Sequence, residues 1–284
     1  MFEIQCVGGN RFFRINSLEI PLQDFAKCKS NYAGSVFLLA SGSSAKTFPI
    51  SRYAAYPFIA MNGSIIRLVE EKVRPLFYLC SDKGFPANRP DLAILGCEFA
   101  RNVAMSMECF YEVFLHDKSV LINKSLYLLE RVNRYYNKRP LSDRSFAWSI
   151  RNSSELVGNF SLLCRKPNRI GFSKNLHYGY FCARTIPYIA LQLAYALGFQ
   201  KVFILGMDLN ESAGRFYENK GEGLPSSLDK EFDKLILPAF QFMSKKIVHN
   251  DFRVFNLSPN SRLPDKVVPK ITLDKLDQLL EGDA

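Results

Sequence analysis

Short uninterrupted apolar segments are the feature that most constrains the fold of this chain. Each is bounded by polar or glycine-containing stretches, and helical patterns lie between several of them. A run this short with no polar face predicts a strand that is buried on both sides, as in a parallel sheet. The runs are Ser35–Ala40, Phe58–Met61, Leu76–Cys80, Val202–Leu205 and a similar late segment, Phe252–Phe255.

Two helices are predicted between these runs. Residues 64–72 carry an apolar stripe at helical spacing, which makes a βαβ unit with the runs on either side. In the second helix, Thr185 is a suitable N-cap, Pro187 stands in the first turn and Gly198 ends the pattern. The runs and helices together predict an α/β fold, a Rossmann-like, mostly parallel sheet with helices on both faces.

The length of 284 residues predicts a single α/β domain over residues 1–284 with added segments. Residues 1–16 alternate in polarity around a Gly-Gly-Asn turn and predict an N-terminal β-hairpin. Residues from about 91 to 150 carry helical patterns at 92–107 and 125–136, which predict a helical insertion beside the sheet.

A long polar segment covers residues from about 209 to 235. Loops of this length are uncommon inside compact domains, and many of them cover an active site. We therefore predict a lid loop here.

Composition limits the possible classes of protein. A hydrophobic content of 48% excludes disordered, collagen-like and coiled-coil proteins. The formal charge of +10 predicts an anionic partner. The seven cysteines are scattered and odd in number, which favours reduced core residues over disulfides. We find no signal peptide and no spanning helix in the sequence, so we expect a cytoplasmic protein.

Small polar residues follow four of the predicted strands. Ligands of open α/β sheets bind beyond the carboxyl ends of the strands, where such residues let the backbone approach an anion. Each cluster taken alone is also compatible with ordinary turns and helix caps. The clusters are Ser41–Lys46, Asn62–Ser64, Ser81–Gly84 and Gly206–Asp208.

Several nucleotide-binding motifs are absent from the sequence. There is no Walker A sequence, no G-x-G-x-x-G fingerprint and no D-x-D carboxylate pair for a metal-bound nucleoside diphosphate. A nucleoside monophosphate fits better, because Arg215, Tyr217 and backbone amides could meet its charge without a divalent cation. The three histidines are too dispersed for a histidine-based metal site, and we expect no metal and no cofactor.

The order and spacing of the motifs along the chain resemble those of a known protein family. Over about residues 35–275 the chain resembles the lipopolysaccharide-core Kdo (3-deoxy-D-manno-octulosonic acid) transferases of the WaaZ type. It is more distantly similar to bacterial sialyltransferases that use CMP-activated sugars. The motifs are Leu39–Thr47, Ala60–Ser64, Leu79–Asp82, Gly171–Lys174, Tyr178–Tyr180, Gly206–Leu209, Arg215–Tyr217 and Asn256–Ser258.

The resemblance implies transfer of Kdo from CMP-Kdo to a Kdo residue of the lipid A inner core. By position, the residues at the strand ends would hold the donor, and Arg215 and Tyr217 would meet the leaving phosphate. The donor-binding candidates are Ser41, Gly42, Ser43, Ser44, Asn62, Ser81, Arg215 and Tyr217.

The general base does not follow from the resemblance. Sialyltransferases of this kind are expected to use a lid histidine, but this chain has none between Glu218 and Val248. A carboxylate at a strand end is a natural substitute, and the candidates are Asp82 and Asp208, with His177 third. Asp208 could instead cap the loop after its strand, and His177 could be an ordinary loop residue.

A basic segment interleaved with aromatic residues lies within the predicted insertion. Its cations Arg131, Arg134, Lys138 and Arg139 predict contact with the anionic inner-membrane surface or with a phosphorylated glycolipid acceptor, Kdo-lipid A. Arg165, Lys166 and Arg169 add to this basic surface. The alternative is a solvated helix face. We expect a peripheral protein on the inner face of the bacterial inner membrane.

Other functions stay open at this level. The donor could be another CMP-nonulosonate, such as CMP-sialic acid. A nucleic-acid-binding protein is less favoured, because the basic residues are spread along the chain and no nucleic-acid-binding motif is present. A membrane-bound interaction protein without catalysis is the remaining alternative.

Overall fold

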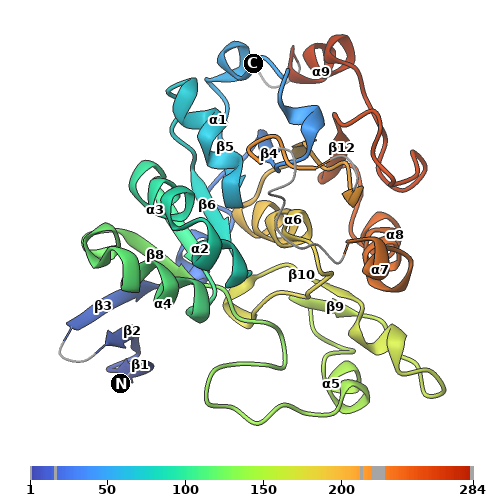
Figure 1. Ribbon diagram of the computed structural model, residues 1–284. Coiled ribbons are helices and arrows are strands. Elements are labelled where there is room, and N and C mark those ends of the chain that lie inside the picture. The colour runs from blue at the N-terminus through green and yellow to red at the C-terminus, as the bar shows by residue number, and fades with distance from the viewer. Residues whose placement is uncertain (1, 16–17, 212–213, 219–227, 282–284) are drawn as a thin grey trace.

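A ten-stranded sheet forms the centre of the computed structural model, which describes residues 2–15, 18–211, 214–218 and 228–281 (Figure 1). The strand order is β1-β2-β3-β8-β7-β6-β5-β4-β11-β12. The bounds are β1 (Phe2–Val7), β2 (Asn10–Ile15), β3 (Leu18–Gln23), β4 (Ser35–Leu39), β5 (Phe58–Met61), β6 (Phe77–Cys80), β7 (Asn102–Met105), β8 (Ser125–Leu128), β11 (Lys201–Leu205) and β12 (Arg253–Asn256).

Helices and a small second sheet surround this centre. The second sheet pairs β9 (Leu156–Gly158) with β10 (Gly171–Ser173) in antiparallel register. The α-helices are α1 (Ile65–Glu70), α2 (Gly84–Asn88), α3 (Pro90–Phe99), α4 (Met107–His116), α5 (Asp143–Ser149), α6 (Ile186–Leu197), α7 (Leu228–Glu231), α8 (Leu237–Lys246) and α9 (Leu273–Leu280).

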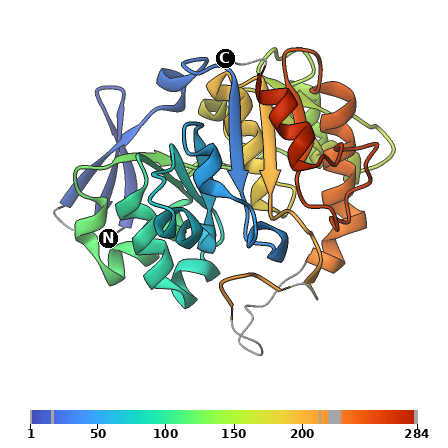
Figure 2. The ribbon, with the colours of Figure 1, turned by 90° about the horizontal axis from the view of Figure 1, so that it is seen from above.

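The sheet is mostly parallel, as the apolar runs predict. Every neighbouring pair from β3 to β12 is parallel, whereas β1, β2 and β3 form an antiparallel meander. The predicted N-terminal hairpin is β1 and β2. From β4 the sheet continues through β5 on one side and through β11 on the other, so the strand order reverses between β4 and β11 (Figure 2).

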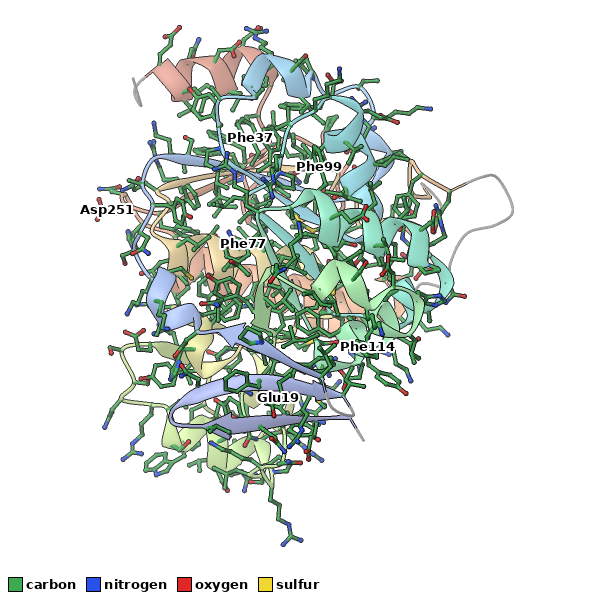
Figure 3. The ribbon with its side chains drawn as sticks, turned by 90° about the vertical axis from the view of Figure 1, so that its left-hand side faces the viewer. Glu19, Phe37, Phe77, Phe99, Phe114 and Asp251 are labelled. Atoms are coloured by element: carbon green, nitrogen blue, oxygen red, sulfur yellow. The ribbon has the colours of Figure 1, made fainter. Side chains whose placement is uncertain are left out.

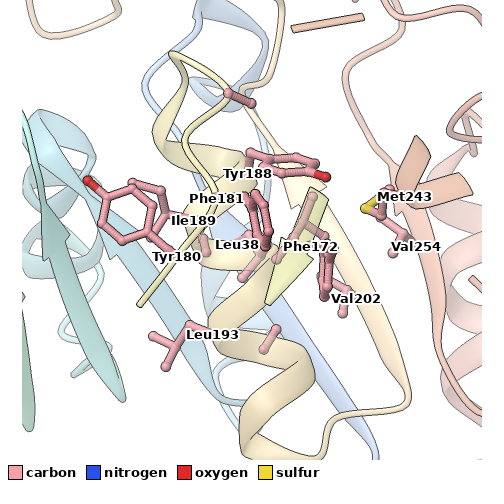
Figure 4. Close-up of a cluster of buried hydrophobic side chains, with 14 of the residues drawn as sticks. Leu38, Phe172, Tyr180, Phe181, Tyr188, Ile189, Leu193, Val202, Met243 and Val254 are labelled. Atoms are coloured by element: carbon pink, nitrogen blue, oxygen red, sulfur yellow. The ribbon is translucent and has the colours of Figure 1, made fainter. Parts of the chain in front are cut away.

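Both faces of the sheet are covered, so the predicted α/β architecture is confirmed. Alternate residues of β4 enter different cores: Leu38 packs in the core that contains α6 and α8, and Phe37 in the core that contains α1, α3, α4 and α9. Figure 4 shows part of the first core around Leu38. Figure 3 labels Phe37 and Phe77, which are almost fully buried on opposite faces.

Helix α6 follows the predicted boundaries and organises the segment beside it. Gly198 ends the helix in the left-handed region with φ 101°, but the Thr185 side chain makes no capping hydrogen bond. The buried Gln192 accepts from the Ser173 and Phe181 amides at 2.9 Å each and donates to the Phe181 carbonyl at 3.0 Å. This amide therefore fixes residues 173–181 against the helix.

The predicted helical insertion at residues 91–150 is wrong. The first helix ends at Phe99, and the next residues form β7 inside the main sheet; the second predicted helix begins as β8 and continues as a loop. The segments of β7 and β8 are only four residues long, and a short apolar run does not distinguish a strand from a helix. Pairing with strands on both sides decides the outcome.

The predicted lid loop lies partly outside the described residues, at 212–213 and 219–227. The last part of the predicted lid loop is helical: it consists of α7 and of a π-helical turn that begins at Phe232 and ends at Ile236.

The seven cysteines are all free. Cys80, Cys97 and Cys109 are buried as predicted, whereas Cys6 and Cys164 are exposed. Across the described ranges, the helices lack the length and apolar character that crossing a bilayer requires.

Candidate functional site

A cavity of about 1030 Å³ opens at the carboxyl ends of the parallel strands. Its wall includes residues that directly follow β4, β5, β6, β7, β8 and β11. All four predicted polar clusters reach it: the strand-end residues are Ser41, Gly42, Asn62, Ser81, Asp82, Gly206 and Asp208. The cavity therefore lies where the strand order reverses, which is the usual ligand position in open α/β sheets.

The loops after β4 and β11 are joined by one buried carboxylate. Asp208, which is 5% exposed, accepts hydrogen bonds from the Ser44 amide at 3.0 Å, from the Ser44 hydroxyl and from the Ser43 hydroxyl at 3.3 Å. Gly42 is required here, because a Cβ atom would lie 2.5 Å from both the Asp208 carboxylate and the Gly206 carbonyl. Ser43 and Ser44 thus point at Asp208 and are not among the residues that line the cavity.

A third loop completes this junction. The fully buried Ser258, just after β12, accepts from the Met207 amide at 2.9 Å and bonds the Ser44 hydroxyl at 2.9 Å. The Asn256 side chain in turn accepts from the Ser258 amide at 2.9 Å. These bonds fix the cavity floor and give Asp208 the loop-capping role that the sequence left open.

Asn62 has the clearest signature of a ligand contact. It lies on the cavity wall with φ 49°, in the left-handed region that non-glycine residues seldom occupy. Its Oδ1 atom is buried and, among the described residues, has no hydrogen-bond partner. Strained backbone and an unsatisfied acceptor are costly, and both are common where a ligand binds.

Arg215 lies beside the Ser41 loop. It pairs with Gly42 in an isolated antiparallel bridge, and the Phe216 amide donates to the Ser41 carbonyl at 3.1 Å. The guanidinium forms an ion pair with Glu218, and both residues line the cavity. The Arg215 cation is thus placed on the part of the cavity wall beside the loop after β4.

Tyr217 does not line the cavity, contrary to its predicted contact with the leaving phosphate. Its ring packs directly on Gly63, where a Cβ atom would come within 2.3 Å of the ring, and meets Phe85 edge-on at 6.2 Å. Burial raises the pKa of Tyr217 to about 12, so the phenol is protonated at neutral pH. Its position indicates support of the Asn62 loop.

The three candidate bases occupy different surroundings. Asp82 is exposed on the cavity wall; its Oδ1 accepts from the Gly84 amide at 3.0 Å, while Oδ2 accepts no hydrogen bond in the described part of the chain. Asp208 is committed to the loop junction. His177 is not a cavity residue: its Nδ1 lies 2.7 Å from Asp24 Oδ1, so the structure does not bring it to the site.

Three further arginines line the cavity and are called the arginine wall: Arg131, Arg134 and Arg184. Arg131 and Arg134 belong to a loop after β8 rather than to a helix, and Tyr180 holds this loop through a bond from the Val132 amide at 3.0 Å. Arg184 joins them with φ 58°, directly before the N-terminus of α6. Lys138 and Arg139 of the same predicted basic segment are exposed and do not line the cavity.

Arg184 and Glu108 are among the cavity residues that the sequence analysis did not identify. Arg184 carries no motif, although its position before the predicted N-cap was a possible signal. Glu108 stands in the first turn of α4, where a carboxylate is ordinary for a helix start. Among the described residues, no cluster of three or more His, Cys, Asp or Glu side chains could hold a metal ion.

Comparisons with known proteins agree on one family. The family model described as 3-deoxy-D-manno-octulosonic acid transferase WaaZ matches residues 22–274. A probable 3-deoxy-manno-octulosonic acid transferase of Salmonella typhimurium is 29% identical over 261 residues, which is 87% of this chain and 90% of the relative. Another of the same description from Escherichia coli is 27% identical over 244 residues, which is 85% of this chain and 83% of the relative.

Two solved structures are similar at a lower level. The MAf glycosyltransferase of Magnetospirillum magneticum AMB-1 has a TM-score of 0.48 and 16% identity, covering 92% of this chain and 37% of its own. The sialyltransferase CstII of Campylobacter jejuni has a TM-score of 0.39 and 11% identity, covering 84% of this chain and 86% of its own. At these scores neither likeness carries an argument.

The loop junction predicts a coupled loss of stability. Asp208→Ala removes the acceptor of the Ser43 hydroxyl and of the Ser44 amide, so we expect the free energy of unfolding to fall by about 1–3 kcal/mol. Ser44→Ala should cost less, and the double variant no more than Asp208→Ala alone, because one network is removed. Denaturant titration measures this. An Asp208→Ala protein of native stability would contradict the structural role.

Proposed function

The chain belongs to the WaaZ family of Kdo transferases, which matches residues 22–274, and we propose that its cavity transfers Kdo from CMP-Kdo to a Kdo residue of the lipid A inner core. The protein is accordingly a glycosyltransferase of lipopolysaccharide core biosynthesis. The observation that carries the location of the reaction is Asn62, on the cavity wall directly after β5: its backbone is in the left-handed region, and its buried Oδ1 has no hydrogen-bond partner among the described residues.

The donor is proposed to occupy the end of the cavity formed by the loops after β4, β5 and β6. Asn62 Oδ1 would accept a hydrogen bond from an amino or hydroxyl group of the nucleotide, with Ser41 and Ser81 beside it. Arg215 would meet the phosphate charge, in competition with its present partner Glu218. No metal or other cofactor is proposed, because the leaving group is a monophosphate and a guanidinium can meet its charge.

The chemistry follows from the charges that develop. The bond from the anomeric carbon of Kdo to the phosphate oxygen breaks, and its electron pair leaves with CMP. An acceptor hydroxyl oxygen then bonds to that carbon and gives its proton to a base. Asp82 is the proposed base, since it is an exposed carboxylate with one oxygen available on the cavity wall. Arg215 stabilises the departing charge.

The acceptor is proposed to occupy the arginine wall. Arg131, Arg134 and Arg184 form no ion pair with a carboxylate in the described part of the chain, whereas most other arginines there do. Three such cations beside the N-terminus of a 12-residue helix favour an anionic ligand. The carboxylate of an acceptor Kdo, or a phosphate of the inner core, has the required charge.

The location of the protein is part of this proposal. The acceptor is a lipid, so we place the enzyme at the inner face of the bacterial inner membrane. The exposed Lys138 and Arg139 are compatible with an anionic surface there. Nucleic acid is not a proposed partner, because the basic residues are spread along the chain and no nucleic-acid-binding motif is present.

Kdo transfer is tested by incubating the protein with a CMP-Kdo-generating system and Kdo-lipid A, followed by mass spectrometry. We expect the mass of one Kdo to be added, and Asp82→Asn to lower kcat by about 100-fold or more while CMP still binds. No added mass, together with transfer from CMP-sialic acid, would replace Kdo by another CMP-nonulosonate as the donor.

The acceptor wall gives a separate prediction. Arg184→Ala and Arg134→Ala should each raise KM for the acceptor about tenfold, since a charge-assisted hydrogen bond is lost, and should leave the affinity for CMP unchanged. The matched control is Arg101→Ala, an exposed arginine outside the cavity. If the variants lost affinity for CMP and kept the same KM for the acceptor, these arginines would bind the donor and not the acceptor.

A further inference from the structure

Exposed apolar side chains gather on one part of the surface. Of the eleven large apolar residues that are exposed in the described part of the chain, five lie between positions 141 and 163. Leu162 is 66% exposed, Leu163 is 94% exposed and Trp148 is 52% exposed. We call Trp148, Phe160, Leu162 and Leu163 the apolar tip. Isolated exposed leucines need no explanation, but a cluster of this kind marks an interaction surface.

Two elements are joined to build this tip. The Trp148 ring of α5 packs on Phe160 with ring centroids 5.1 Å apart. Asp143, at the start of α5, forms ion pairs with Arg169 of the 3₁₀ turn Lys166–Arg169 at 2.7 Å and with Arg165, directly before this turn, at 2.9 Å. Burial alone would raise the pKa of Asp143, but the hydrogen bonds from Arg169 and Arg165 lower it. The carboxylate therefore keeps its charge and holds α5 and the turn together.

A buried side chain holds the two ends of the loop that carries Leu162 and Leu163. Asn168, which is 3% exposed, accepts from the Ser161 amide at 2.6 Å and donates to the Ser161 carbonyl at 2.9 Å. These bonds fix the ends of the loop, so that Leu162 and Leu163 stand outward between them. In Figure 1 this yellow-green segment projects from the body of the molecule, on the same side as α5. The display of the leucines is thus built into the fold.

A cation packs on the apolar tip, and further cations lie close to it in the sequence. The Arg151 guanidinium lies 4.0 Å from the centre of the Trp148 ring. The nearby acids are already engaged, Asp143 with two arginines and Glu155 with Lys29 at 2.8 Å. The cations of residues 139–169 are Arg139, Arg144, Arg151, Arg165, Lys166 and Arg169.

We propose that the apolar tip inserts into the headgroup region of an anionic lipid bilayer. Leucine and tryptophan side chains prefer the boundary between headgroups and acyl chains, while arginine and lysine reach the lipid phosphates. A second copy of the chain is a poorer occupant, because pairing two such surfaces would bring their cations together.

The tip is connected to the cavity. Asn133 exchanges two hydrogen bonds of 2.8 Å with the backbone of Leu141, just before α5. The next residue, Arg134, lines the acceptor wall. The loop that carries the cavity arginines is therefore fastened to the base of the tip, and a bilayer on the tip would lie next to the part of the chain proposed to bind a lipid acceptor. Only this last step rests on the proposed function.

The single tryptophan of the chain makes the tip directly observable. Vesicles of phosphatidylglycerol and phosphatidylethanolamine should shift the Trp148 emission to the blue, and brominated acyl chains should quench it. Vesicles of phosphatidylcholine should bind at least about tenfold more weakly, because this lipid has no net negative charge to attract the cations. No donor or acceptor is present, so this result is independent of the proposed function.

Substitutions distinguish binding through the apolar tip from nonspecific binding through any exposed apolar side chain. Leu162→Ser with Leu163→Ser should lower partitioning into anionic vesicles about tenfold or more. The control is Leu115→Ser with Ile122→Ser, which removes two other exposed apolar side chains and should change nothing. Turnover of a water-soluble, deacylated acceptor should be the same in all of them.

Three outcomes would overturn the proposal. The first is vesicle binding without quenching of Trp148, and the second is equal loss of binding in the tip and control variants. The third is a blue shift that depends on protein concentration without vesicles and accompanies dimer formation in sedimentation, which would assign the tip to a second copy. An inactive protein whose Trp148 is still quenched would contradict the transferase and leave the lipid contact intact.

Discussion

The parallel pairing of β4 with β11 is the constraint on which the site depends. It places the loops after two strands, which are more than 160 residues apart in the chain, at the same edge of the sheet, where the strand order reverses. Asp208 then closes the gap between them through Ser44, and Ser258 adds a third loop. Without this junction, the residues proposed to bind the donor would have no common wall.

The part of the site at the strand ends could be predicted from the sequence, because buried parallel strands are visible as short apolar runs and their carboxyl ends share an edge. The predicted helical insertion fails for the complementary reason: β7 and β8 are defined by pairing with their neighbours rather than by a pattern of their own. The sequence also does not show in which direction a side chain points. Tyr217 therefore turns out to support Gly63, and His177 to pair with Asp24.

The net positive charge was the most ambiguous feature of the sequence. In the structure, some of the basic residues line the cavity and others lie on the outer surface. Arg131 and Arg134 lie in the cavity with Arg184, a residue that no motif marks. On the outside, Arg151 packs on the exposed Trp148 ring, and further cations lie nearby in the sequence. The sequence assigned one membrane-contacting segment. Folding instead places a proposed acceptor wall and a proposed lipid contact in different surroundings, and Asn133 joins the two through its hydrogen bonds to Leu141.

A crystal structure of the protein with CMP tests the central assignment most directly. The assignment predicts the nucleotide in the cavity, with a polar group of the nucleoside bonded to Asn62 Oδ1 and the phosphate beside Arg215. It also predicts that the arginine wall stays open for the acceptor. A nucleotide bound against Arg131, Arg134 and Arg184, or outside the cavity, would contradict it.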